Sequence, residues 1–101
     1  MFGLNFSKKT DEFSLSLAEG FLHDFPIEAD EKNKSRIKNQ KKFNKALKNI
    51  DIKIQEYKSS NKLNIYKKAR IGNKFMWFLK EHGYAEDLVE EITKHILIKL
   101  N

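Results

Sequence analysis

Apolar residues recur at three- and four-residue spacing along most of the chain, which is the period of an amphipathic α-helix. One stripe precedes Pro26, a residue that blocks helix continuation; its members are Phe13, Leu17, Ala18, Phe21, Leu22 and Phe25. A second stripe alternates steps of four and three; its members are Phe43, Leu47, Ile50, Ile54 and Tyr57. The spacing therefore predicts helices over residues 10–25 and 34–58.

Two further helices are predicted in the C-terminal half, over residues 62–82 and 85–100. Gly83 separates them, because glycine accepts the left-handed conformation in which many helices end. The apolar stripe of the last helix consists of Leu88, Val89, Ile92, Ile96 and Leu100. The chain has 101 residues, one proline and four glycines, and it shows no internal repeat. We therefore predict one all-α domain, residues 1–101, built as a small bundle of about four helices.

The helix ends carry more specific expectations. Ser7 or Thr10 is expected to cap the first helix and Asn61 the third, because short polar side chains accept hydrogen bonds from the first free N–H groups of a helix. Apolar residues also alternate at positions 2–6 and 50–54, as they would in a strand. A small two-stranded element is therefore the alternative to helix in these two places.

Charge is strongly segregated along the chain, although the net charge is only +6. Residues 1–31 carry two lysines against seven acids, and residues 81–101 carry two lysines against five acids. Residues 32–80, in contrast, carry sixteen cations against two acids. A basic centre of this kind attracts polyanions, but the acidic ends could also fold back and neutralise it within one molecule.

The most basic stretch, residues 32–48, holds eight cations and no acid. On a helix, the lysines opposite the apolar stripe fall within an arc of about 80°. These candidate binding residues are Lys34, Lys38, Lys41, Lys45 and Lys48. An ordinary solvated face mixes Glu with Lys four residues apart, which supports the helix, whereas this face accepts like-charge repulsion. It is either simply the solvated back of the helix or a surface that binds phosphates.

A second candidate surface lies on the helix predicted at 62–82, where Tyr66 and Trp77 share one side with several cations. The candidate binding residues there are Lys67, Arg70 and Lys74. Nucleic-acid-binding surfaces combine cations, which neutralise phosphates, with aromatic rings, which stack on exposed bases. Residues 75–79 are apolar on all sides of the helix, however, so we expect Trp77 in the core.

Catalytic and metal chemistry have little support in the sequence. There is no cysteine, and none of the three histidines lies four residues from another, so no pair of metal ligands is expected. Neither a phosphate-binding glycine loop nor a nucleophile motif is present. We expect a protein that is not an enzyme and uses no cofactor or metal.

The longest apolar run, "FMWFL" at residues 75–79, is far shorter than a membrane-spanning helix. The first residues turn polar after Phe6, too early for a signal peptide. We therefore expect no membrane partner and a cytoplasmic location.

The stretch "LKEHGYAEDLVEEITKHI", residues 79–96, resembles one helical repeat of the RecX recombination-regulator family. Similar pairs of helices joined by a glycine and an aromatic residue occur in ubiquitin-associated domains. The resemblance covers under a fifth of the chain and a single repeat copy. It implies a capped turn that fixes two helices, which is a structural role, so it adds no binding residues.

The sequence thus favours a small helical protein that binds nucleic acid through a basic face of the helices at 34–58 and 62–82, largely without sequence preference. DNA and RNA are both open as partners. The alternative is a protein-interaction module, either a homodimer or an adaptor for an acidic partner, because opposite charges are segregated along the chain. In a third reading the acidic ends cover the basic centre within one molecule.

Overall fold

A computed structural model describes the backbone of residues 2–27 and 40–101. The described residues form helices and connecting turns, without a strand, so the two-stranded alternative is wrong for 2–6 and 50–54. The helices are α1 (Phe2–Asp24), α4 (Gln40–Ser60), α5 (Ile65–Glu81) and α6 (Glu86–Leu100). The expected all-α bundle is confirmed. Within the described residues, no helix combines the length and apolarity needed to cross a bilayer.

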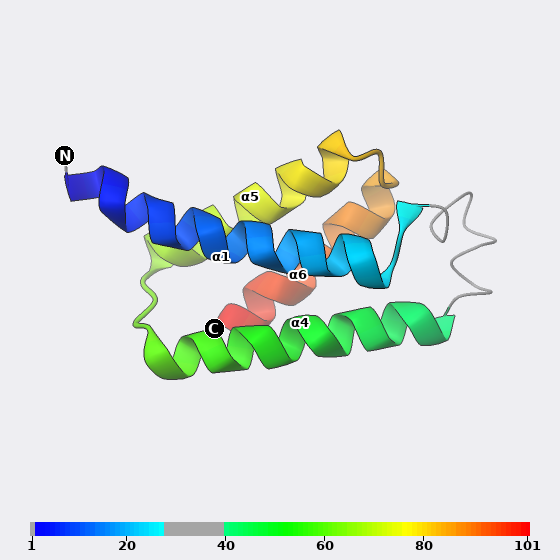
Figure 1. Ribbon diagram of the computed structural model, residues 1–101, viewed down its shortest axis with the longest axis horizontal. Helices are drawn as coiled ribbons and strands as arrows, with labels where there is room; N and C mark the ends of the chain where they lie inside the picture. The colour runs from blue at the N-terminus through cyan, green and yellow to red at the C-terminus, as the bar shows by residue number, and fades with distance from the viewer. Residues whose placement is uncertain (1, 28–39) are drawn as a thin grey trace.

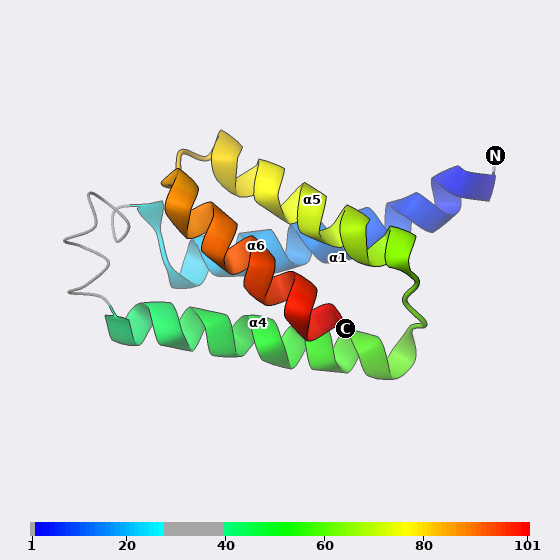
Figure 2. The same ribbon diagram turned by 180° about the vertical axis from the view of Figure 1, so that it is seen from behind.

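The four helices are arranged so that each packs against two others. Helix α1 lies against α4 and α5, and α6 lies against the same two helices from the other side. Figures 1 and 2 show α1 and α6 between α5, at the upper edge of the view, and α4, at the lower edge. Successive helices run in opposite directions along a body 45 Å long. Helices α4 and α5 therefore occupy opposite corners of the bundle.

The predicted apolar stripes all point into one core, in which aromatic rings from three helices meet. The Phe21 ring lies 5.6 Å from the rings of both Phe25 and Tyr84, and the Phe25 ring lies 5.4 Å from that of Phe43. Each large apolar side chain buried in this way contributes about 1.5–3 kcal/mol. The fully buried members of the core include Phe21, Phe25, Phe75, Leu17, Ile54, Ile71, Leu79, Leu88, Ile92, Ile96 and Leu100.

The turn between α5 and α6 is built as the glycine predicts. Gly83 adopts a φ of +90°, which places it in the left-handed region, and its N–H donates to the carbonyl of Lys80 at 3.1 Å. The N–H of Tyr84 donates to the carbonyl of Leu79 at 3.2 Å. The Tyr84 hydroxyl donates a buried hydrogen bond of 2.6 Å to the carbonyl of Phe25. This turn is therefore fastened to the C-terminal end of α1.

The N-terminal boundary of α1 differs from the prediction, whereas that of α4 is not tested. Helix α1 begins at Phe2 rather than Thr10, and Thr10 is buried inside it, so neither Ser7 nor Thr10 is a cap. The first helical residue of the second predicted helix, within the described residues, is Gln40. Its predicted start at 34 lies outside the described residues.

The cap of α5 is Asn64 and not Asn61. The Asn64 side chain accepts a hydrogen bond of 2.8 Å from the N–H of Lys67. Helix α4 continues to Ser60, two residues beyond its predicted end, and the Asn61 amide donates back to the carbonyl of Tyr57 at 3.0 Å. The side chain of Asn61 therefore serves the end of α4, and α5 starts at Ile65, three residues later than expected.

Candidate functional site

The solvent side of α4 carries a row of lysines that we call the lysine ridge: Lys41, Lys45 and Lys48. All three are exposed, on the side of the helix opposite the buried Phe43, Ala46, Ile50 and Ile54. Within the part of the chain that the structure describes, none of the three forms an ion pair. Lys34 and Lys38, which the sequence assigns to the same face, lie outside the described residues. Among the residues that the structure describes, the ridge is therefore a solvated surface without a paired acid, about 10 Å long between Lys41 and Lys48.

The acids of α4 do not neutralise the lysine ridge. Asp51 points toward α6, where one carboxylate oxygen lies 2.6 Å from Nε2 of His95 and the other lies 4.0 Å from Nζ of Lys99. Glu56, the second acid of the helix, is exposed two turns beyond Lys48. The positive charge of the ridge thus faces solvent.

The seam between α1 and α4 uses an acid of the N-terminal segment. The amide of Asn49 donates a hydrogen bond of 2.9 Å to Asp24, whose other oxygen lies 3.3 Å from His23. Burial works to raise the pKa of Asp24, but the hydrogen bond from Asn49 and the adjacent His23 together lower it. Asp24 is therefore a structural carboxylate that joins two helices.

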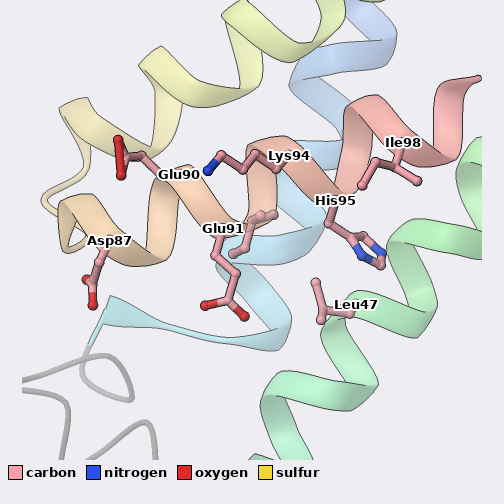
Figure 3. Close-up of a pocket in the computed structure, with 8 residues that line it drawn as sticks. Leu47, Asp87, Glu90, Glu91, Lys94, His95 and Ile98 are labelled. Atoms are coloured by element: carbon pink, nitrogen blue, oxygen red, sulfur yellow. The ribbon is translucent and has the colours of Figure 1, made fainter.

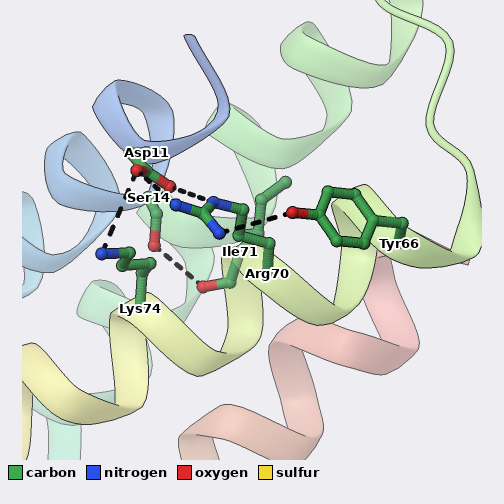
Figure 4. A network of polar contacts seen from close by, with 6 residues as sticks. All are labelled: Asp11, Ser14, Tyr66, Arg70, Ile71 and Lys74. Atoms are coloured by element: carbon green, nitrogen blue, oxygen red, sulfur yellow. Dashed lines mark hydrogen bonds and ion pairs between the residues drawn. The ribbon is translucent and has the colours of Figure 1, made fainter. Parts of the chain in front are cut away.

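The basic side of α5 has a different environment, because it faces Asp11 on α1. The Arg70 guanidinium donates to both carboxylate oxygens of Asp11, from Nε at 2.7 Å and from Nη2 at 3.0 Å (Figure 4). Lys74 lies 4.0 Å from the same carboxylate, and Nη1 of Arg70 lies 3.5 Å from the Tyr66 hydroxyl. One acid of the N-terminal segment therefore does fold onto the basic centre, at two of the predicted binding residues.

The pairing of Asp11 with Arg70 shifts the titration of both groups. The hydrogen bonds from Arg70 lower the pKa of Asp11, outweighing the opposite effect of burial, and the positive charges of Arg70 and Lys74 add to the lowering. The hydrogen bond to Asp11 raises the pKa of Arg70 in turn. The pair thus stays ionised at neutral pH, and Arg70 is engaged in holding α1 to α5.

Trp77 is 53% exposed, so its predicted burial in the core is wrong. The buried residues of α5 are Ile71, Gly72, Phe75 and Leu79, and Trp77 lies on the opposite side of the helix. Tyr66, on the same outward line, is 57% exposed. The exposed Asn73 lies between them, and Nζ of Lys80 lies 5.2 Å from the centre of the Trp77 ring. We call Tyr66, Asn73 and Trp77 the aromatic surface.

The aromatic surface borders an open hollow of about 410 Å³ between α1 and α5. Leu15 on α1, which is 45% exposed, supplies apolar area across from Trp77. Charged groups of both signs stand at the rim. The residues that line the hollow are Asp11, Leu15, Asn73, Lys74, Trp77, Phe78 and Glu81.

The structure therefore divides the predicted binding residues between two surfaces. Lys41, Lys45 and Lys48 stand on α4, whereas Arg70 and Lys74, with the half-buried Lys67, stand on α5 at the opposite corner of the bundle. A continuous basic face that spans both helices is not formed by these residues. The binding residues predicted from the sequence do not include Asn73 and Lys80. Their helical phase, which they share with Tyr66 and Trp77, is the sequence feature that places them on this surface.

Helix α6 presents the acidic counterpart, with a hollow between it and α4 (Figure 3). The residues that line it are Leu47, Asp87, Glu90, Glu91, Ile92, Lys94, His95 and Ile98.

Among the described residues, no group of three or more His, Cys, Asp or Glu side chains is placed to hold a metal ion. No family model, curated protein or solved structure matches the chain.

Proposed function

We propose that this protein is a non-catalytic nucleic-acid-binding protein that contacts phosphates through the lysine ridge, largely without sequence preference. The observation that supports it best is the ridge itself. Its three exposed lysines have no ion-pair partner among the described residues, and the acids of the same helix lie elsewhere. Phosphates would supply the missing negative charge, and neutralising them releases condensed counterions, which favours binding.

The energetic cost of the ridge strengthens the proposal. Lys41 and Lys45 are four residues apart, and Lys45 and Lys48 are three apart. The two lysines of each pair repel each other, which costs a few tenths of a kcal/mol in the free protein. A helix whose outer face served only solubility would gain stability from a glutamate at one of these positions. A bound phosphate backbone offsets this repulsion, because each lysine then attracts a phosphate as a point charge.

The proposal predicts a steep dependence of binding on salt. Binding of a labelled 20-base-pair duplex is measured by fluorescence anisotropy at several salt concentrations, for the wild type and for the triple variant Lys41→Glu, Lys45→Glu, Lys48→Glu. We expect the variant to bind about a hundredfold more weakly at low salt, with a log–log salt slope smaller by about two to three.

The control is a triple variant with the same change in net charge at other exposed positions: Lys8→Glu, Lys9→Glu, Lys94→Glu. It should retain most of the affinity and most of the salt slope. An equal loss in both variants would mean that only net charge matters, which contradicts a binding surface on α4. Absence of any binding to DNA or RNA at low salt would end the proposal.

A protein-interaction module is the second candidate, because α6 presents acids and an apolar residue on its outer side. Glu90 is exposed there, and Ile98 is 69% exposed. The acidic side of α6 in one molecule is complementary to the lysine ridge of another, which would produce a head-to-tail contact. Light scattering at low and high salt tests this candidate. A head-to-tail contact predicts an assembly at low salt that dissociates as salt is added and that is weakened by Glu90→Lys.

A further inference from the structure

The aromatic surface and its neighbouring cations follow one line of α5. Tyr66 and Trp77 are eleven residues apart, which is close to three helical turns, so they share one side of the helix about 16 Å apart. Arg70, Asn73 and Lys74 lie between them, and Lys80 lies one turn beyond Trp77. Rings, an amide and positive charges thus alternate along a track that is open to solvent.

Large aromatic side chains are seldom left exposed without a partner, because burying them is strongly favourable. Phe75 and Leu79 fill the core positions nearby, so Trp77 is not needed for packing. One face of the Trp77 ring is covered only by the Lys80 ammonium, which lies 5.2 Å from its centre. A flat, electron-poor partner can take that position, and Lys80 then stays beside it.

Charge favours an anionic partner for this track. Three cations on α5 border it, Arg70, Lys74 and Lys80, against the two carboxylates Asp11 and Glu81. Arg70 and Asp11 neutralise each other through hydrogen bonds from Nε and Nη2, which leaves Lys74 and Lys80 against Glu81. Asn73, midway along the track, can both donate and accept hydrogen bonds at the edge of a base.

These features match the chemistry of an unpaired strand. In a duplex the base faces are hidden by stacking, so exposed rings gain nothing from it, whereas the bases of a single strand are free to stack on protein rings. The hollow beside Trp77, with Leu15 on its far wall, leaves room for a flat group next to the ring. The lysine ridge lacks any aromatic residue and offers contacts to phosphates alone.

We infer that the aromatic surface of α5 binds single-stranded nucleic acid, with bases stacked on Trp77 and Tyr66 and phosphates near Lys74 and Lys80. This inference rests on the proposed function, and it assigns unpaired strands to a surface separate from the lysine ridge. The ridge then contacts backbone phosphates of either form of nucleic acid.

Trp77 is the sole tryptophan of the chain, so its fluorescence reports on this surface directly. Titration of the wild type with a 12-nucleotide oligothymidylate should quench the Trp77 emission in a saturable way, because base stacking on indole quenches it. An equal concentration of duplex phosphate should quench it far less. Emission spectra of the protein alone, recorded at two protein concentrations, test whether a second copy covers the ring instead.

Two substitutions separate stacking from charge. By anisotropy with a labelled oligothymidylate, Trp77→Ala should weaken single-strand binding by about tenfold, and Trp77→Phe should restore most of it because phenylalanine also stacks. Duplex binding should stay within about twofold in both variants. Trp77 is half exposed and outside the core, and circular dichroism melting checks that both variants fold like the wild type.

The outcomes separate the two proposals. Single-strand binding that proceeds without quenching and is unchanged by Trp77→Ala overturns the inference and leaves the proposed function standing. A blue shift of the emission with protein concentration alone, accompanied by dimer formation, also overturns it, because a second copy then occupies the surface. If the wild type binds neither DNA nor RNA, both the proposed function and this inference are wrong.

Discussion

The outer faces of α4 and α5 are both basic in sequence, yet the fold gives them different surroundings. On α4, Lys41, Lys45 and Lys48 face solvent, and the nearby acid Asp51 is turned toward α6. On α5, Arg70 is bound from two nitrogens by a carboxylate of α1. One face therefore stays unpaired within the described residues, and the other is partly neutralised and carries exposed aromatic rings instead.

The difference teaches that a basic run has no fixed meaning until its neighbours are known. Helix α1, which packs against both α4 and α5, places Asp11 beside α5 and Asp24 beside Asn49 of α4. The same N-terminal segment thus partly neutralises the basic face of α5 and leaves that of α4 unchanged. Whether cations bind a partner or stabilise the fold depends on contacts with residues that are far away in the sequence.

The largest effect on this contrast should come from Asp11→Asn, which makes the cations of α5 as unpaired as those of α4. We expect the free energy of unfolding to fall by about 1–2 kcal/mol, because two charge-assisted hydrogen bonds are weakened. Single-strand binding should become a few fold tighter, since the positive charge of Arg70 is no longer neutralised. Urea unfolding and anisotropy measure the two effects.

The control for Asp11→Asn is Glu12→Gln at the neighbouring exposed carboxylate, which removes the same charge from the same helix. It should change stability by less than about 0.5 kcal/mol. If both variants lose the same amount of stability, the Arg70 contact is not what holds the two helices together there.

The stabilising effect of Asp11 should depend on pH in a defined direction. The pKa of Asp11 is lowered in the folded state by Arg70, so its contribution is fully present above the pKa of the unfolded chain, whose ordinary value is 3.8. That contribution is lost as the pH falls through the lower, folded-state pKa. The stability gap between the wild type and Asp11→Asn should thus be constant near neutral pH and shrink below about pH 4. A gap that widens on acidification contradicts this assignment.

The smallest expected effects have opposite signs on the two faces. Lys45→Glu places an acid between Lys41 and Lys48, so it should raise the free energy of unfolding by about 0.5 kcal/mol while it weakens nucleic-acid binding. Lys74→Glu removes a cation that lies 4.0 Å from Asp11 and brings an acid near it, so it should lower stability by a similar amount. Equal signs in the two unfolding curves would mean that the faces do not differ.

The apolar stripes of α1, α4 and α6 could be predicted from the sequence, because burial of one side of a helix is encoded in residue spacing alone. The end of α5 was predictable for a similar reason, since Gly83 with its φ of +90° is a local requirement. The apolar run at 75–79 predicts burial of Trp77, which is wrong, because the helical phase of this residue places it on the exposed side. Ile71, Phe75 and Leu79 already define the buried side, and Trp77 lies away from it.

The contacts of the candidate site could not be predicted in the same way. Asp11 and Arg70 are 59 residues apart, and nothing in the sequence pairs these two groups rather than others of the same charge. The division of the cations between two corners depends on which helices touch, and that is set by packing of the whole core. The start of α1 at Phe2 was missed because Ser7 and Thr10 resemble caps, although Thr10 is buried inside the helix.

The placement of α4 and α5 at opposite corners of the bundle has a consequence for stoichiometry. A strand held on one corner cannot reach the other without passing around α1 or α6, so under the proposed function each molecule has a valency of two. Such a protein cross-links nucleic acid when strands are in excess and coats them separately when protein is in excess. Turbidity or sedimentation plotted against the protein-to-nucleotide ratio would then pass through a maximum, a behaviour that a single basic face does not produce.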